Sequence, residues 1–267
     1  MKIVSSKRQT IKECLEENNF SKHIIRNMKK NHISIGTEKK RLWETVLEKE
    51  TLEIGFGIEE STIIPVKGDI NVVFEDEYIL IVNKPNNQAS MPNRGHYKTS
   101  LANYVKYYFE RNKIFNTIHL VNRLDYPTSG LVLIAKNKLI HGLLFKTDIK
   151  KKYYAVVVGK IESGVIEKPI QKDNNKRTIG GDTMAKTEYN VIKHKTNSLL
   201  DINLITGRTH QIRVHMAYLN HPIVGDKLYG SGQDLALQSY YLQFIHPITK
   251  NDMVIQIDLE ERLESKI

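Results

Sequence analysis

The stretch from His119 to Lys136, HLVNRLDYPTSGLVLIAK, limits the possible folds of this chain more than any other. Its apolar run Leu131–Ala135 is short, rich in Val and Ile and bounded by Gly and Pro signals, which favours a buried β-strand over a helix. Tyr126 precedes a proline and is biased towards extended backbone, so no helix is expected to run through the turn. The sequence therefore predicts a stiff polar turn that presents Asp125 beside a core strand.

Asp125 can have either of two roles in such a turn. Asp and Ser side chains often hydrogen-bond the backbone of a turn, which would explain Asp125 and Ser129 without any chemistry. A loop on a rigid scaffold is also the usual place for a catalytic carboxylate, and Arg123 lies two residues before Asp125. The turn alone does not distinguish a structural from a catalytic aspartate.

Composition narrows the class of protein. The chain has 267 residues and is 40% hydrophobic, enough for one large domain or a large and a small one. Its apolar runs are far shorter than the roughly 18 residues of a membrane span, and its N-terminus has no apolar signal-peptide core. Cys14 is the only cysteine, so we expect no disulfide, no cysteine-rich zinc site and a cytoplasmic protein.

The charge indicates a polyanionic partner. The net charge is +10 and the pI is about 9.4, and Lys and Arg side chains that neutralise phosphates release bound counterions. A basic surface that serves only solubility is the alternative. Between Phe20 and Arg41 one acidic residue, Glu38, accompanies seven basic ones: Lys22, Arg26, Lys29, Lys30, Lys39, Lys40 and Arg41.

Three motifs, in this order along the chain, carry a family resemblance. They are Arg123-Leu124-Asp125-x-x-Thr128-Ser129-Gly130-Leu131 with Ala135-Lys136, then Lys151-x-Tyr153-x-Ala155-x-Val157-x-Gly159, then Gly207–Gly230, GRTHQIRVHMAYLNHPIVGDKLYG. Together they resemble the motifs of the RluA-type pseudouridine synthases. The chain departs from the family at Asn122, where a histidine is usual, and we interpret this position as supporting rather than catalytic.

The resemblance implies an α+β fold with a large, bent, mainly antiparallel sheet and an active cleft across its middle. The sequence agrees, because its expected strands outnumber its helices and do not alternate regularly with them. We expect the catalytic domain at residues 67–267. Residues 1–66 resemble a degenerate S4-like RNA-binding domain with a linker, in which Ser21 caps a second helix that runs to about Lys30.

The resemblance also implies an activity and its residues. Pseudouridine formation breaks the N1–C1′ bond of a uridine in RNA, turns the uracil and rejoins it through C5. Asp125 matches the catalytic carboxylate and Arg213 the arginine that pairs with it. Arg123 matches the residue that fills the space left by the flipped base, Tyr153 matches the aromatic that lies against the uracil, and Arg208 is expected to contact phosphate.

This isomerisation is redox-neutral, so the resemblance implies no nicotinamide, flavin, ATP or metal cofactor. We expect a monomer whose partner is ribosomal or transfer RNA; the sequence does not say which RNA or which uridine. The main alternative is a non-catalytic RNA-binding protein that keeps the fold. A nucleoside hydrolase or glycosidase would need a second carboxylate or an aspartate cluster for calcium, and neither is evident in the sequence.

Three local expectations concern less distinctive segments. Thr209 is expected to cap a helix from about His210 to Leu219. Within residues 168–190, Gly181–Thr187 looks like a phosphate-binding loop but lacks the glycine before its lysine, so we expect it to be an ordinary loop leading into a strand at Thr187–Ile192. The histidines at 210, 215 and 221 do not share one helical face, which argues against a metal site.

Overall fold

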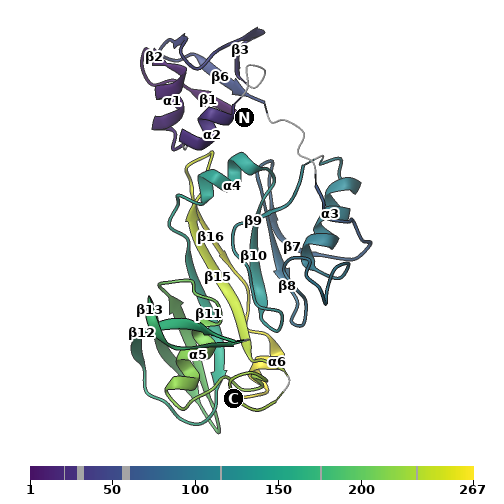
Figure 1. Cartoon of the computed structure of the whole chain (residues 1–267), viewed down its shortest axis with the longest axis vertical. Helices are drawn as coiled ribbons and strands as arrows, with labels where there is room; N and C mark the ends of the chain where they lie inside the picture. Colours follow the sequence, from purple (N-terminus) through teal and green to yellow (C-terminus); the bar gives the residue numbers. More distant parts are fainter. Residues whose placement is uncertain (21, 29–32, 56–60, 115, 175, 233) are drawn as a thin grey trace.

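The computed structural model describes residues 1–20, 22–28, 33–55, 61–114, 116–174, 176–232 and 234–267 (Figure 1). Residues 1–55, which we call the N-terminal unit, form a small sheet in the order β1-β6-β3-β4, a separate β2-β5 pair and two short helices. Ser21 and Lys30, the expected ends of the second helix, lie outside the described residues. The elements are β1 (Lys2–Val4), β2 (Gln9–Thr10), α1 (Ile11–Glu17), α2 (Lys22–Asn27), β3 (Ile33–Ile35), β4 (Glu38–Lys39), β5 (Thr45–Val46) and β6 (Thr51–Ile54).

The rest of the described chain is built on one large sheet. Its main path runs β12-β13-β14-β11-β15-β10-β8-β7, with β16 paired to β15 and β9 to β10. Only β10 and β15 pair in parallel among these strands, so the expected mainly antiparallel α+β fold is confirmed. The elements are β7 (Asn71–Glu75), β8 (Ile79–Lys84), α3 (Leu101–Arg111), β9 (His119–Leu120), β10 (Ser129–Ala135), α4 (Lys138–Leu144), β11 (Lys150–Val157), β12 (Gly164–Asp173), β13 (Lys176–His194), β14 (Ser198–Leu204), α5 (Gln211–Tyr218), β15 (Leu237–Ile245), β16 (Asp252–Gln256) and α6 (Glu261–Glu264).

The central strands are buried on both faces of the sheet. In β10, Val132 and Ile134 belong to one apolar cluster, while Leu131 and Leu133 between them belong to another. Alternate side chains of a strand point to opposite faces, so an apolar residue is needed at every position. This double burial explains why the segment reads as a continuous apolar run in the sequence.

Different elements cover the two faces. Helices α3, α5 and α6 contribute Phe109, Met216 and Leu263 to the first cluster. Helix α4 and the N-terminal unit share the second cluster, to which they contribute Leu144 and Leu15 respectively. The N-terminal unit accordingly lies beside α4 at one end of the large sheet (Figure 1). It packs against the rest of the molecule through apolar side chains.

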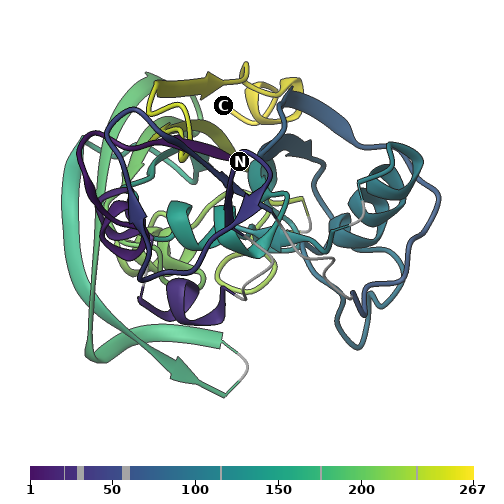
Figure 2. The ribbon, with the colours of Figure 1, turned by 90° about the horizontal axis from the view of Figure 1, so that it is seen from above.

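The hairpin of β12 and β13 corrects one expectation. The segment Gly181–Thr187 is not a loop, because it lies within β13. Only a register shift between Pro169 and Ile170 interrupts the pairing of β12 with β13. The hairpin projects beyond the body of the molecule (Figure 2). Many of its side chains are exposed, so it lacks the apolar alternation that identifies a half-buried strand in a sequence.

Gly130 allows β10 and β15 to approach one another closely. Its φ is +111°, and a Cβ there would lie 2.1 Å from the carbonyl oxygen of Ser239. We expect Gly130→Ala to lower the free energy of unfolding by about 3 kcal/mol or more, because strain and a backbone clash coincide. Gly55→Ala is the matched control, since a Cβ there meets no atom of the described residues within 4 Å. Equal urea midpoints for the two variants would refute this role for Gly130.

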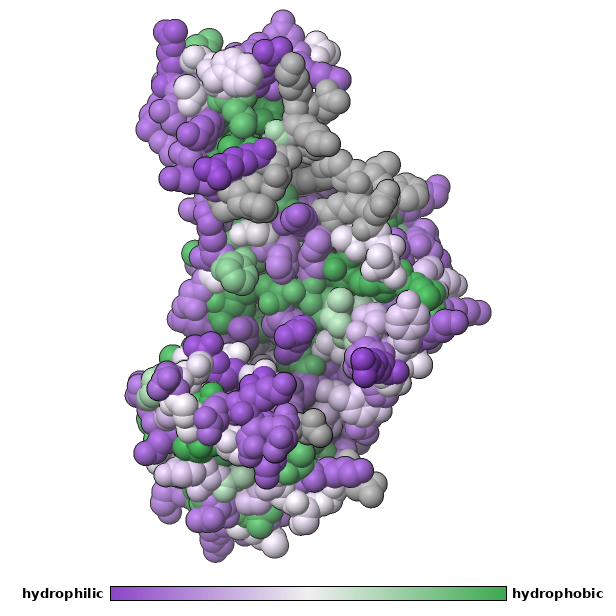
Figure 3. Space-filling model, in the orientation of Figure 1, coloured by the Kyte–Doolittle hydropathy of each residue, from purple (hydrophilic) through white to green (hydrophobic). Residues whose placement is uncertain are grey.

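None of the helices in the described residues is long and apolar enough to cross a membrane. On the face shown in Figure 3, hydrophobic surface gathers in a hollow across the middle of the molecule, with hydrophilic surface above and below it.

Candidate active site

The loop that carries Asp125 is fixed by side chains on both sides. Asn122 accepts a hydrogen bond from the backbone amide of Leu133 at 2.7 Å and donates one to the carbonyl of Leu131 at 3.1 Å. The hydroxyl of Ser90 donates to the carbonyl of Leu124 at 2.7 Å and accepts from its amide at 3.1 Å. The residues just before Asp125 are therefore tied to strand β10 and to a second loop. Asn122 has a supporting position, as the sequence predicts.

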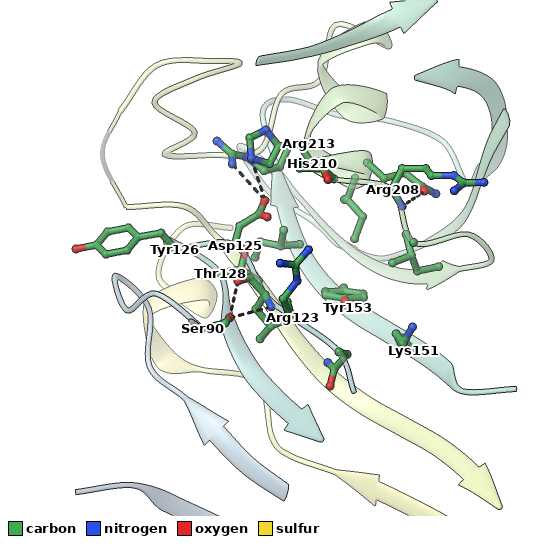
Figure 4. Close-up of a pocket in the computed structure, with 18 of the residues that line it drawn as sticks. Ser90, Arg123, Asp125, Tyr126, Thr128, Lys151, Tyr153, Arg208, His210 and Arg213 are labelled. Atoms are coloured by element: carbon green, nitrogen blue, oxygen red, sulfur yellow. Dashed lines mark hydrogen bonds and ion pairs between the residues drawn. The ribbon is translucent and has the colours of Figure 1, made fainter. Parts of the chain in front are cut away.

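Asp125 lines a pocket of about 530 Å³, and two basic side chains face its carboxylate (Figure 4). Arg213 Nη1 lies 3.3 Å from Asp125 Oδ2, and His210 Nε2 lies 3.6 Å from the same oxygen. The Asp125 side chain is 27% exposed, so it is open to the pocket although it is paired. Asp125 and Arg213, which the sequence motifs named, lie beside one another. His210 was not assigned to the site from the sequence.

Arg213 has a closer partner than Asp125. Its Nε and Nη2 donate to the two carboxylate oxygens of Asp226 at 2.8 and 2.7 Å. The Asp226 side chain is fully buried and also accepts from the backbone amides of Leu228 and Tyr229. Burial would raise the pKa of Asp226, but Arg213 and these amides together hold it below its ordinary value. Asp226 thus fixes the guanidinium, and the remaining nitrogen reaches Asp125.

The helix that carries Arg213 does not begin as expected. Helix α5 starts at Gln211 after His210, whose φ is +57° and whose side chain makes no capping bond, so Thr209 is not the cap. The Gln211 side-chain oxygen instead accepts from the amide of Arg208 and the hydroxyl of Thr206. The left-handed residue turns the chain sharply, so that His210 and Arg213 face the same carboxylate.

The other three expected residues also line the pocket. The Tyr153 ring comes from β11 and is only 7% exposed, and burial raises the pKa of its hydroxyl to about 12, so it stays protonated at neutral pH. Arg123 is exposed and makes no hydrogen bond or ion pair with any described residue. Arg208 is exposed and donates to the carbonyl of Met184 at 3.5 Å. Two arginines are therefore available to an anionic ligand at this pocket.

Known proteins resemble this chain over much of its length. The family model described as RNA pseudouridylate synthase matches residues 78–218, more than half of the chain. An RNA pseudouridine synthase of Bacillus subtilis is 38% identical over 215 residues, which cover 74% of this chain and 71% of that protein. The chain belongs to the RNA pseudouridylate synthase family.

Further relatives extend the match. A second Bacillus subtilis RNA pseudouridine synthase is 32% identical, and the match covers 97% of this chain and 98% of that protein. Ribosomal large subunit pseudouridine synthase D of Blochmanniella floridana is 34% identical, covering 87% and 83% respectively. The structure of human RNA pseudouridylate synthase domain containing 1 has the same fold, with a TM-score of 0.61, 22% identity, and coverage of 78% of this chain and 89% of that one. This chain is thus an RNA pseudouridine synthase, an isomerase that acts on RNA.

Sequence reasoning overlooked one buried cation of this synthase. Lys84, at the end of β8, is fully buried, and its ammonium group lies 2.8 Å from the carbonyls of Pro85 and Gln88 and 3.4 Å from that of Tyr126. Burial lowers the pKa of Lys84 to about 7. Lys84 therefore ties the residue after Asp125 to the end of β8. No motif of the sequence analysis indicated this contact.

The three histidines that were considered for a metal site each face another group of the protein. His210 faces Asp125, His215 lies 2.9 Å from the hydroxyl of Thr187, and His221 lies 2.8 Å from the carbonyl of Val158. Within the described ranges, no group of three or more His, Cys, Asp or Glu side chains is arranged to hold a metal ion.

Proposed function

We propose that Asp125 is the carboxylate that acts on the ribose of the target uridine, as nucleophile or as base. The supporting observation is that Asp125 lies on a braced loop, open to a pocket, with one oxygen paired to Arg213. The N1–C1′ bond breaks, the uracil turns, the C5–C1′ bond forms, and the hydrogen at C5 is lost while N1 gains one. Arg213 holds the carboxylate in its orientation during these steps.

The target base has to leave its stack before this chemistry, which costs a few kcal/mol. Arg123 is exposed at the pocket without a protein partner among the described residues, and we assign it to the space that the flipped uridine leaves. Tyr153 presents a rigid, buried ring to the same pocket and is placed to lie against the extruded uracil. Arg208 is exposed at the pocket and is assigned to a backbone phosphate.

The target we propose is a uridine of large-subunit ribosomal RNA, with the cytoplasm as the place of action. The support is that several relatives are named ribosomal large subunit pseudouridine synthase D, at 33–35% identity. Pseudouridines mapped in total RNA, with and without the gene, test this proposal. A missing pseudouridine in large-subunit RNA is the expected result. A loss confined to transfer RNA would overturn the choice of target while leaving the activity intact.

The N-terminal unit is proposed to bind RNA in the manner of an S4-like domain, ahead of a catalytic domain at residues 67–267. Lys22 and Arg26 lie on α2, and Arg41 lies in the loop after β4. The Arg41 guanidinium lies 5.1 Å from the ring centre of Trp43, which is 68% exposed. A cation beside an exposed aromatic ring is typical of a nucleic-acid-binding surface. The cation contacts phosphates, and the aromatic ring stacks on bases. Lys29 and Lys30 of the basic run lie outside the described residues.

We expect the triple variant Lys22→Gln, Arg26→Gln and Arg41→Gln to bind RNA more weakly and with a shallower salt dependence. Each lost phosphate contact lowers the slope of log K against log salt by about 0.7–0.9. The matched control removes the same charge from three exposed lysines near the β13–β14 turn, Lys160, Lys193 and Lys195. The measurement is the RNA affinity of each variant at several salt concentrations, which gives the slope of log K against log salt. An unchanged slope in the first variant would exclude the N-terminal unit from RNA binding.

A further inference from the structure

His210 has defined partners on both of its ring nitrogens. Nε2 lies 3.6 Å from Asp125 Oδ2, and Nδ1 lies 2.9 Å from the hydroxyl oxygen of Tyr229. The two rings meet edge to face, with their centres 5.7 Å apart. The other oxygen of Asp125, Oδ1, accepts no hydrogen bond from any described residue. The nitrogens of Arg213 and His210 that approach this carboxylate therefore approach the same oxygen.

The hydrogen on the Tyr229 hydroxyl can be located from its partners. The backbone amide of Arg177, on β13, lies 2.8 Å from the Tyr229 oxygen, and an amide can only donate. Burial raises the pKa of Tyr229, so the hydroxyl keeps its hydrogen at neutral pH. Because its oxygen accepts from Arg177, its hydrogen is free to point at the remaining partner, His210 Nδ1.

The tautomer of His210 follows from this direction. A nitrogen that accepts a hydrogen bond carries no hydrogen in the neutral ring, so the hydrogen sits on Nε2, the atom that faces Asp125. The charged groups around the ring are Asp125 before β10, Arg213 on α5, Asp226 in the loop after α5 and Arg177 on β13. Burial outweighs the attraction of the two carboxylates and lowers the pKa of His210, so the ring is neutral at pH 7.

We propose that Tyr229 and His210 form a positioning relay, in which the Tyr229 hydroxyl fixes the His210 tautomer whose Nε2 hydrogen points at Asp125 Oδ2. The relay rests on the proposed role of Asp125 as the reacting carboxylate. With Arg213 and His210 both on Oδ2, Oδ1 is the oxygen left free for the ribose. The relay also joins the backbone of the projecting β12–β13 hairpin to the reacting group.

Two substitutions of His210 separate this relay from a purely structural role. His210 has a φ of +57°, a conformation that Asn adopts more readily than Gln does. Gln, however, can place its amide nitrogen near the position of Nε2, while the Asn side chain ends near the position of Nδ1. Backbone fit therefore favours His210→Asn, whereas a hydrogen-bond donor to Asp125 requires His210→Gln.

We expect His210→Gln to lower kcat by no more than about threefold and His210→Asn to lower it by about tenfold, as for the loss of one N–H group that points at a charged carboxylate. KM should change little, because the relay orients a reacting group and does not hold the RNA. The melting temperatures should follow the opposite order to the activities. His210→Asn should melt at a higher temperature than His210→Gln, because Asn fits the backbone at this position better. Activities that follow the order of melting temperatures would overturn the relay.

The tautomer itself can be read without any turnover. In protein labelled with nitrogen-15 histidine, the two ring nitrogens of each neutral histidine give distinct shifts, and loss of a signal in His210→Gln assigns His210. We expect the hydrogen on Nε2 in the wild type and a mixture of tautomers in Tyr229→Phe. A hydrogen on Nδ1 in the wild type would overturn the relay. If Asp125→Asn stays active while these shifts hold, the role of Asp125 fails and the tautomer assignment does not.

Discussion

Arg213→Met is expected to lower the free energy of unfolding by about 3–5 kcal/mol, because it removes one member of a buried ion pair. The Arg213 side chain is 6% exposed and that of its partner Asp226 is fully buried. Methionine fills a similar volume but gives the Asp226 carboxylate no donor. Two backbone amides remain on Asp226, and they cannot offset the loss of a bidentate guanidinium. Urea unfolding of wild type and variant at pH 7 measures the difference.

A second substitution identifies which carboxylate the arginine supports. In the Arg213→Met background, Asp226→Asn should recover part of the lost stability, since no uncompensated buried charge remains. Asp125→Asn should recover little, because the Asp125 side chain is 27% exposed and can be solvated. The family resemblance named only Asp125 as the partner of Arg213. Additive effects of Arg213 and Asp226 within about 0.5 kcal/mol in a double-mutant cycle would contradict the pairing.

The same pair predicts a dependence on pH. In the wild type the pKa of Asp226 lies below its ordinary value, so the pair stabilises the fold above that value and the stabilisation is lost as the pH falls through the folded-state pKa. Without Arg213, burial should raise the pKa of Asp226, and protonation at falling pH should then stabilise the variant. The difference in unfolding free energy between wild type and variant should shrink from pH 7 towards pH 4.

The scaffold of the site could be predicted from local sequence. The β-branched run Leu131–Ala135 is a strand, and the polar turn before it does present Asp125. Helix α3 begins after Ser100, where Ser100 and Asn103 form a reciprocal capping box. In these segments the intrinsic strand or helix propensity, the turn residues and the pattern of buried apolar residues all favour the element that the structure has. The motifs then placed Tyr153, Arg208 and Arg213 at the same pocket.

The contacts within the site could not be predicted in the same way. Asp226 meets Arg213 because the chain turns back at Gly225, whose φ is +79° and where a Cβ would lie 2.0 Å from the carbonyl oxygen of Asp234. Helical periodicity does not show that Arg213 is buried, so nothing in the sequence required a second carboxylate. His210 faces Asp125 through a left-handed backbone, and sequence rules assign that conformation to glycine or asparagine before histidine.

Asp125→Asn is expected to reduce turnover by about a thousandfold or more while the fold and the affinity for RNA are kept. An amide has the shape of the carboxylate but can act neither as nucleophile nor as base towards the ribose. The fold should tolerate the change because Arg213 keeps both bonds to Asp226 and the loop bonds of Asn122 do not involve the Asp125 side chain. Asp252→Asn, at an exposed position of β16, is the matched control.

Tritium release tests the role of Asp125 most directly, because formation of the C5–C1′ bond displaces the hydrogen at C5 of the target uridine. Total RNA from cells that lack the gene, labelled with uridine tritiated at C5, serves as substrate whichever uridine is the target. The wild type and Asp252→Asn should release tritium to water at similar rates. Asp125→Asn should bind the same RNA and release none above the rate without enzyme. Release by Asp125→Asn within about tenfold of the wild type would mean that another group performs the chemistry, since loss of an essential reacting group costs far more.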